Sequence, residues 1–238
     1  MAKILLNSYP RTGMSFLGNL LRVAFKRNLS DEYGEYSNRE NFFLWSHTPV
    51  MLLGKFDGIA QITIVRDPIE VIPSLAAKLD SGIGLSVHDS QITYHNPHKE
   101  SFESYEEYVQ HTITSMSDEF LSYLENTLNN FDDLIVVSFD DVVNDTKKTI
   151  DFIMDSVKQD FTQLSESEIL IINDIYYNQC QEEDESIPVA ARRMPVTEKP
   201  QEYYDFKDAL LKSDKIDKLV DAYGKIQERI ILKQSNGI

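Results

Sequence analysis

Residues 3–17 read KILLNSYPRTGMSFL and begin with a short apolar run that is typical of a buried strand. Tyr9-Pro10 ends the run, and the turn Arg11-Thr12-Gly13-Met14-Ser15 follows. Apolar residues at helical spacing come next and predict an amphipathic helix. The free N–H groups and the dipole of a helix's first turn attract anions, and Arg11 adds a permanent cation. The stretch therefore predicts an anion-binding loop between a strand and a helix.

The turn by itself does not identify a ligand. It lacks the Walker A pattern GxxxxGK[ST], so the stretch alone fits a structural turn as well as an anion site. Other polar residues that the fold brings to the same place must decide between these interpretations.

The composition is that of an ordinary globular protein of 238 residues, with 42% hydrophobic residues and a net charge of −16. The length suits one sizeable α/β domain or two small ones. No linker-like break appears, which favours a single domain over residues 1–238. The negative charge argues against nucleic acid as a partner, so a phosphate-bearing ligand needs local basic groups. Such groups cluster in the first third of the chain, with Arg192-Arg193 as a later exception.

Cys180 is the only cysteine, so no internal disulfide can form, which is typical of a reducing compartment. No apolar run approaches the ~20 residues of a membrane-spanning helix. The N-terminus does not have the pattern of a signal peptide. We therefore expect a cytoplasmic protein without a membrane span, and the oligomeric state stays open.

Strands alternate with helices along the chain. Apolar or β-branched runs predict strands at 3–8, 42–45, 59–65 and 134–139. Helical patterns cover 68–79, 102–128, 145–157, 166–179 and 204–232, and residues 80–101 form a long loop typical of a lid or binding loop. This alternation predicts an α/β domain with a central, mostly parallel sheet flanked by helices. Ligands bind at the carboxyl ends of such strands, where Arg11, His47, Arg66 and Asp140 follow.

The helix after strand 59–65 has a clear start signal. Asp67 suits its N-cap, and Pro68 suits its first position. Pro73 lies inside the pattern and should kink the first turns or delay the regular part of the helix.

Two stretches resemble motifs of the sulfotransferases. YPRTGMSFL at 9–17 resembles the 5′-phosphosulfate loop, usually written YPKSGTTWL. RDPIEVIPSL at 66–75 resembles the 3′-phosphate motif RNPxDVxxSx, with Arg66 and Ser74 eight residues apart as in the family. His47 lies between the motifs, at a strand end where the cytosolic members carry the catalytic histidine. The resemblance implies the P-loop-like sulfotransferase fold over almost the whole chain.

The resemblance also implies a two-ended clamp for 3′-phosphoadenosine 5′-phosphosulfate (PAPS), the co-substrate, with no metal. The first loop would hold the phosphosulfate end, the second motif and the late arginine pair would hold the 3′-phosphate, and two aromatic rings would face the adenine. The residues assigned in this way are Arg11, Thr12, Gly13, Met14, Ser15, Phe16, Arg66, Ser74, Phe139, Arg192 and Arg193.

The implied reaction is transfer of the sulfo group to an acceptor hydroxyl. His47, whose imidazole titrates near neutrality, would take the proton from the hydroxyl, and Arg11 would stabilise the leaving oxygen. A carboxylate could be the base instead, because some sulfotransferases use a glutamate. The acceptor is open, with a small molecule or a carbohydrate as the expected class.

Two other functions remain open at this point. A P-loop phosphotransferase (kinase) would need a Walker lysine, which is missing, and a carboxylate for Mg²⁺, which Asp140 could mimic. A non-catalytic nucleotide-binding relative is the second alternative. The combined presence of Arg11, His47, Arg66 and Ser74 favours an enzyme.

Overall fold

The computed structural model describes residues 3–24, 42–46, 59–80, 99–157, 167 and 199–235. Three predicted site residues, His47, Arg192 and Arg193, lie outside these residues. Most of the predicted loop at 80–101 and all but one residue of the predicted helix at 166–179 also lie outside them.

The described strands form one parallel sheet, in the order β2-β1-β3-β4. Their bounds are β1 Lys3–Asn7, β2 Phe42–Ser46, β3 Ile59–Val65 and β4 Ile135–Ser138. In the register, Leu6 of β1 lies opposite Trp45 of β2 and Ile62 of β3. The predicted α/β class with a parallel sheet is confirmed. The chain leaves β1 toward β2 on one side and returns to β3 on the other, so the switch point lies between β1 and β3.

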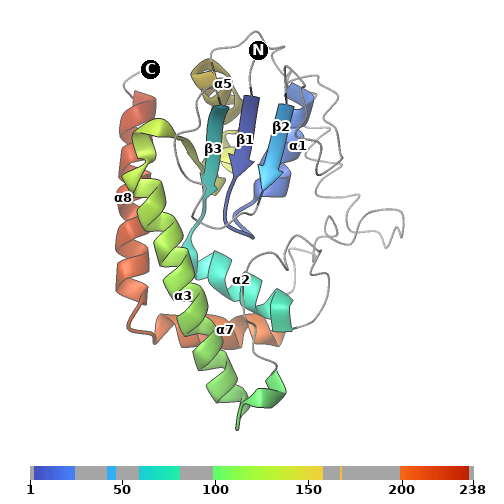
Figure 1. The fold of residues 1–238 in the computed structure, drawn as a ribbon, viewed down its shortest axis with the longest axis vertical. Helices are drawn as coiled ribbons and strands as arrows, with labels where there is room; N and C mark the ends of the chain where they lie inside the picture. The colour runs from blue at the N-terminus through green and yellow to red at the C-terminus, as the bar shows by residue number, and fades with distance from the viewer. Residues whose placement is uncertain are drawn as a thin grey trace, which may run out of the picture.

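Helices cover both faces of the sheet and extend beyond its carboxyl end (Figure 1). One face packs on α1 (Met14–Ala24) and α5 (Thr146–Val157), and the other packs on α3 (Tyr105–Asn129) and α8 (Ile216–Ser235). Beyond the strand ends lie α2 (Pro68–Asp80) and α7 (Gln201–Leu211), which pack against each other (Figure 1). The shorter elements are α4 Phe139–Asn144 and the 3₁₀ helices η3 Lys99–Ser101 and η4 Phe131–Asp133.

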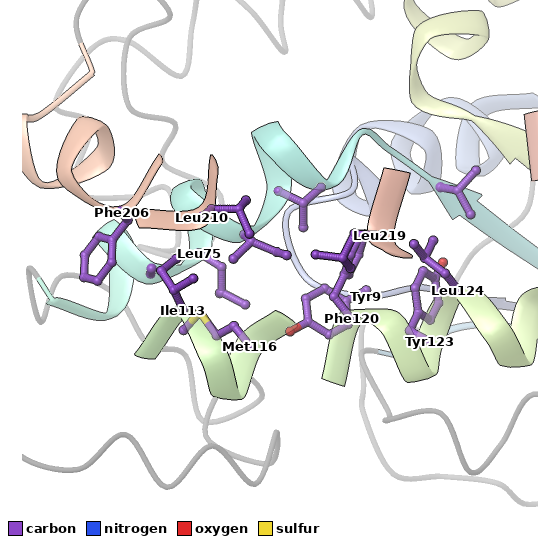
Figure 2. Close-up of a cluster of buried hydrophobic side chains, with 14 of the residues drawn as sticks. Tyr9, Leu75, Ile113, Met116, Phe120, Tyr123, Leu124, Phe206, Leu210 and Leu219 are labelled. Carbon is purple, nitrogen blue, oxygen red and sulfur yellow. The ribbon is translucent and has the colours of Figure 1, made fainter. Parts of the chain in front are cut away.

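The alternation of side chains along each strand divides the core in two. Ile62 and Ile64 point to the α1 and α5 face, whereas Val65 joins the cluster under α2 and α3. Figure 2 shows part of the second cluster, in which Tyr9, Phe120 and Tyr123 bring three rings together. Tyr9 lies two positions after β1, in the loop that leads to α1, so this loop is anchored directly in the core.

The start of α2 agrees with the sequence. Asp67 caps the helix, because its Oδ1 accepts a hydrogen bond from the N–H of Ile69 at 2.8 Å. The helix begins at Pro68 and continues through Pro73, so its regular part is not delayed, and a kink of the first turns stays a prediction.

Two other predicted boundaries differ because hydroxyl groups take over backbone partners. The strand at 134–139 ends at Ser138, whose Oγ accepts from the N–H of Asp141 and caps α4, so that Phe139 leaves the sheet. The long helix at 204–232 is two helices, α7 and α8. Between them, the Oγ of Ser213 accepts from the N–H of Lys215 at 3.2 Å. Among the described helices, none is both long enough and apolar enough to span a membrane.

Glu119 makes the stability of this fold depend on pH. It is half-buried on α3, and burial raises the pKa of its carboxyl group from 4.5 to about 7. Its contribution to stability is therefore fully present below pH 4.5 and is lost as the pH rises through 7. We expect Glu119→Gln to raise the free energy of unfolding at pH 8 by about 1 kcal/mol, after allowance for solvent screening, with little change at pH 4.

Urea unfolding between pH 4 and 8 measures this effect. Glu125→Gln, at an exposed site on the same helix, is the matched control and should follow the wild type. An identical pH profile for the wild type and Glu119→Gln would contradict the prediction.

Candidate anion-binding site

The loop between β1 and α1 has an unusual backbone. Arg11 has a φ of 68° and Gly13 a φ of 100°, both in the left-handed region, which an arginine adopts only when its surroundings hold it there. The carbonyl oxygen of Gly13 accepts from the N–H groups of Phe16 and Leu17 and starts α1. Within the described residues, the N–H groups of Gly13 and Met14 donate to no protein acceptor. They are available to an anion at the N-terminus of α1.

The pairing of β1 with β3 ends at Leu6 and Ile62, just before this loop. Beyond that point, side chains take the place of backbone-to-backbone hydrogen bonds between the two strands. The Oγ of Ser8 accepts from the N–H of Ile64 at 2.8 Å, and the hydroxyl of Tyr123 donates to the carbonyl oxygen of Ile64 at 3.0 Å. The hydroxyl of Thr63 donates to the carbonyl oxygen of Asn7. These bonds satisfy the backbone on both sides of the opening between β1 and β3.

Residues of the second motif hold Arg11 in place. The Nε of Arg11 donates to the Oγ of Ser74 at 3.1 Å, across 63 positions of sequence. The Nη1 of Arg66 donates to the carbonyl oxygen of Arg11 at 3.4 Å. All three residues are partly exposed. The structure thus brings the two motifs, each ambiguous alone, to one site at the switch point of the sheet.

Phe139 connects the loop to Arg66. Its ring lies against Gly13, where a Cβ atom would come within 2.3 Å of the ring, and the Cζ of Arg66 lies 4.2 Å from the ring centroid. Arg229 is bound in the same manner elsewhere, over Phe131 at 4.4 Å with an Nη1 bond to a carbonyl oxygen. The two arginines differ in charge compensation. Arg229 pairs with Asp132 at 3.0 Å, whereas no carboxylate of the described residues lies within salt-bridge distance of Arg66.

The structure adds a group of residues that the sequence did not indicate. Glu70, in the first turn of α2, accepts from the Nζ of Lys207 at 2.9 Å and from the hydroxyl of Tyr203 at 3.0 Å. Burial alone would raise the pKa of Glu70, but these two donors, with the charges of Lys207 and Arg66, lower it overall. The Nζ of Lys199 lies 4.8 Å above the ring of Tyr203. Lys199, Tyr203 and Lys207 lie far from both motifs in the sequence, whereas Glu70 lies inside the second motif at a position to which the resemblance assigns no role.

Positive charge therefore collects at this site in a strongly acidic protein. Lys199 is half-buried, and its pKa is lowered first by burial and then by the charges of Arg66, Arg11 and Lys207, which Glu70 opposes. Since Glu70 is bound to Lys207 and Tyr203, it compensates this charge only in part. Such a concentration of cations attracts an anion.

The structure places the other predicted site residues as follows. Thr12 is buried, and its hydroxyl donates to the carbonyl oxygen of Tyr9 at 2.7 Å, so its side chain stabilises the loop from inside. The side chain of Met14 is buried as well, so its backbone N–H is the group that remains available to an anion. Ser15 lies in the first turn of α1. The ring of Phe16 is 1% exposed and belongs to the core beneath the loop, so it offers no open face to a base.

Gly13 allows a test of this geometry. We expect Gly13→Ala to lower the free energy of unfolding by about 1–3 kcal/mol, because a Cβ atom strains the left-handed backbone and displaces the ring of Phe139. Gly224 is the matched control, since a Cβ atom there meets nothing within 4 Å inside α8. Gly224→Ala should raise stability by about 0.5–1 kcal/mol. Chemical denaturation measures both variants, and equal effects of the same sign would contradict this account of the loop.

Comparison with known proteins supports the architecture. No protein-family model matches the sequence, and no curated protein does. Among solved structures, the chain is similar to the mouse sulfotransferase SULT7A1, whose crystal structure is of the complex with PAP. The two share 16% sequence identity and a TM-score of 0.53, and the match covers 93% of this chain and 89% of that chain. At this identity the likeness shows the fold, and we conclude that the chain has the sulfotransferase fold, an α/β domain built on a small parallel sheet.

Proposed function

We propose that the protein is a sulfotransferase that moves the sulfo group of PAPS to an acceptor hydroxyl, with residues 1–238 as one domain. The observation that carries the proposal is the bond from the Nε of Arg11 to the Oγ of Ser74. It joins the two motifs, and the resemblance implies that these motifs bind opposite ends of one nucleotide. The fold shared with a sulfotransferase gives independent support.

In this proposal, each of the two motifs binds one end of the nucleotide. The N–H groups of Gly13 and Met14 and the guanidinium of Arg11 bind the phosphosulfate end at the start of α1. Arg66 and Ser74 bind the 3′-phosphate. Arg66 suits this role because its charge lacks a carboxylate partner among the described residues, and a guanidinium binds phosphate in a bidentate manner.

Phe139 is the aromatic residue best suited to contact the adenine. Its ring is partly exposed beside Arg66, in contrast to the buried ring of Phe16. The proposal also keeps Arg192 and Arg193 as further ligands of the 3′-phosphate, on the basis of their charge and position in the sequence.

The chemical step forms a bond from the acceptor oxygen to sulfur and breaks the bond from sulfur to the 5′-phosphate oxygen. Arg11 stabilises the negative charge that develops on this leaving oxygen. His47, which follows β2 in the sequence, takes the proton from the acceptor hydroxyl. The acceptor class is a small molecule or a carbohydrate.

Nucleotide binding tests the proposal without knowledge of the acceptor. We expect adenosine 3′,5′-bisphosphate to raise the melting temperature at micromolar concentration, and ATP and GTP to do so much less. Arg66→Ala should weaken binding of the bisphosphate roughly tenfold or more, because a charge-assisted phosphate contact is lost. Arg229→Ala is the matched control. It loses the same kinds of ring and carbonyl contact far from the site and should keep the wild-type affinity. A wild-type protein that responds to ATP but not to the bisphosphate would refute the proposed function.

A second experiment addresses His47. Once an acceptor is identified, we expect His47→Ala to lower the rate of sulfo transfer by about 10²–10⁴-fold, with the affinity for adenosine 3′,5′-bisphosphate unchanged. Undiminished transfer would assign the base role to another group, such as a carboxylate.

A further inference from the structure

Cations at the junction of α2, α7 and the anion loop outnumber the carboxylates that face them. The charges of Arg66, Arg11 and Lys207 lower the pKa of Lys199, and the carboxylate of Glu70 opposes them. The Nζ of Lys207 forms a salt bridge with the Oε1 of Glu70 at 2.9 Å. In the described part of the chain, Lys199 has no carboxylate within salt-bridge distance. Its charge is therefore the least compensated of the lysines at this junction.

Lys199 is held at this place by α7. Helix α7 begins at Gln201, two positions after Lys199. The Nζ of Lys199 lies 4.8 Å from the ring centroid of Tyr203, which is in the first turn of that helix. The hydroxyl of Tyr203 donates to Glu70 at 3.0 Å, and Glu70 lies in the first turn of α2, four positions after Arg66. The same contacts that fasten α7 to α2 thus keep Lys199 beside the first turn of α2.

A half-buried ammonium group close to the charges of two guanidinium groups is unfavourable. Burial and the charge of Arg66 lower the pKa of Lys199, followed by the charges of Arg11 and Lys207, whereas Glu70 raises it. An anion placed between Lys199 and Arg66 would remove this cost, because each cation gains a partner that the fold does not supply.

We propose that Lys199 is a direct ligand of the nucleotide's 3′-phosphate, positioned by Tyr203 and Glu70. This inference rests on the proposed function, which supplies the nucleotide. It adds to the site a residue that neither motif contains. Tyr203 and Glu70 act as positioning residues, since Tyr203 contacts Lys199 and Glu70 binds Tyr203.

Isothermal titration of the full-length chain with adenosine 3′,5′-bisphosphate and with adenosine 5′-phosphate tests the proposal. We expect Lys199→Met to weaken binding of the bisphosphate roughly tenfold and to leave binding of the 5′-phosphate unchanged, since only the former carries the group that Lys199 contacts. Lys225→Met is the matched control. Lys225 is exposed on α8 and paired with Asp221, so its loss should change neither affinity.

A charge-conserving variant gives a second readout. Lys199→Arg should keep the affinity for the bisphosphate within about threefold, because a guanidinium offers the phosphate the same positive charge. A loss as large as that of Lys199→Met would contradict a role based on charge.

The outcomes separate the two proposals. If the wild type does not bind the bisphosphate, the proposed function fails and the role of Lys199 fails with it. If the wild type binds the bisphosphate and Lys199→Met binds each nucleotide with the wild-type affinity, the role of Lys199 is refuted while the proposed function stands. An equal loss for both nucleotides, in a variant with an unchanged melting temperature, would also refute contact with the 3′-phosphate.

Discussion

The left-handed backbone at Arg11 is the constraint on which the site depends. An arginine does not adopt this conformation without support, and here Ser74 binds its side chain while Arg66 binds its carbonyl oxygen. Both partners come from the segment that follows β3, so the loop after β1 has its shape only when the two strands are paired. The shape of the site therefore depends on the pairing of β1 with β3.

The electrostatics of the protein place a locally positive site in a molecule with a net charge of −16. The acidic surface repels large polyanions, whereas the cluster of cations at the strand ends attracts a compact ligand with few charges. The salt bridge of Glu70 with Lys207 moderates this cluster and at the same time fastens α7 to α2. The carboxylate of Glu70 thus reduces the positive charge of the site and also holds α7 in place beside it.

Local sequence signals predicted most of the elements because hydrophobic periodicity and capping residues are local. The strand at 59–65 and the start of α2 at Asp67-Pro68 agree with the structure for this reason. The ends of β4 and α7 were wrong, since they depend on single hydroxyl bonds of Ser138 and Ser213. The motifs pointed to Arg11, Arg66 and Ser74, which the structure brings into contact with one another. No local pattern points to Lys199, because its place depends on the packing of α7 on α2.

The side-chain bonds of Ser8, Thr63 and Tyr123 at the opening between β1 and β3 have a consequence for the energetics of ligand capture. They satisfy the separated strands before any ligand arrives, so no ladder bond has to break when one enters. A nucleotide would then meet a preorganised cradle, and its contact energy would go into affinity instead of into reshaping the sheet. The free-energy cost of arranging this binding site is therefore met when the protein folds, before a ligand binds.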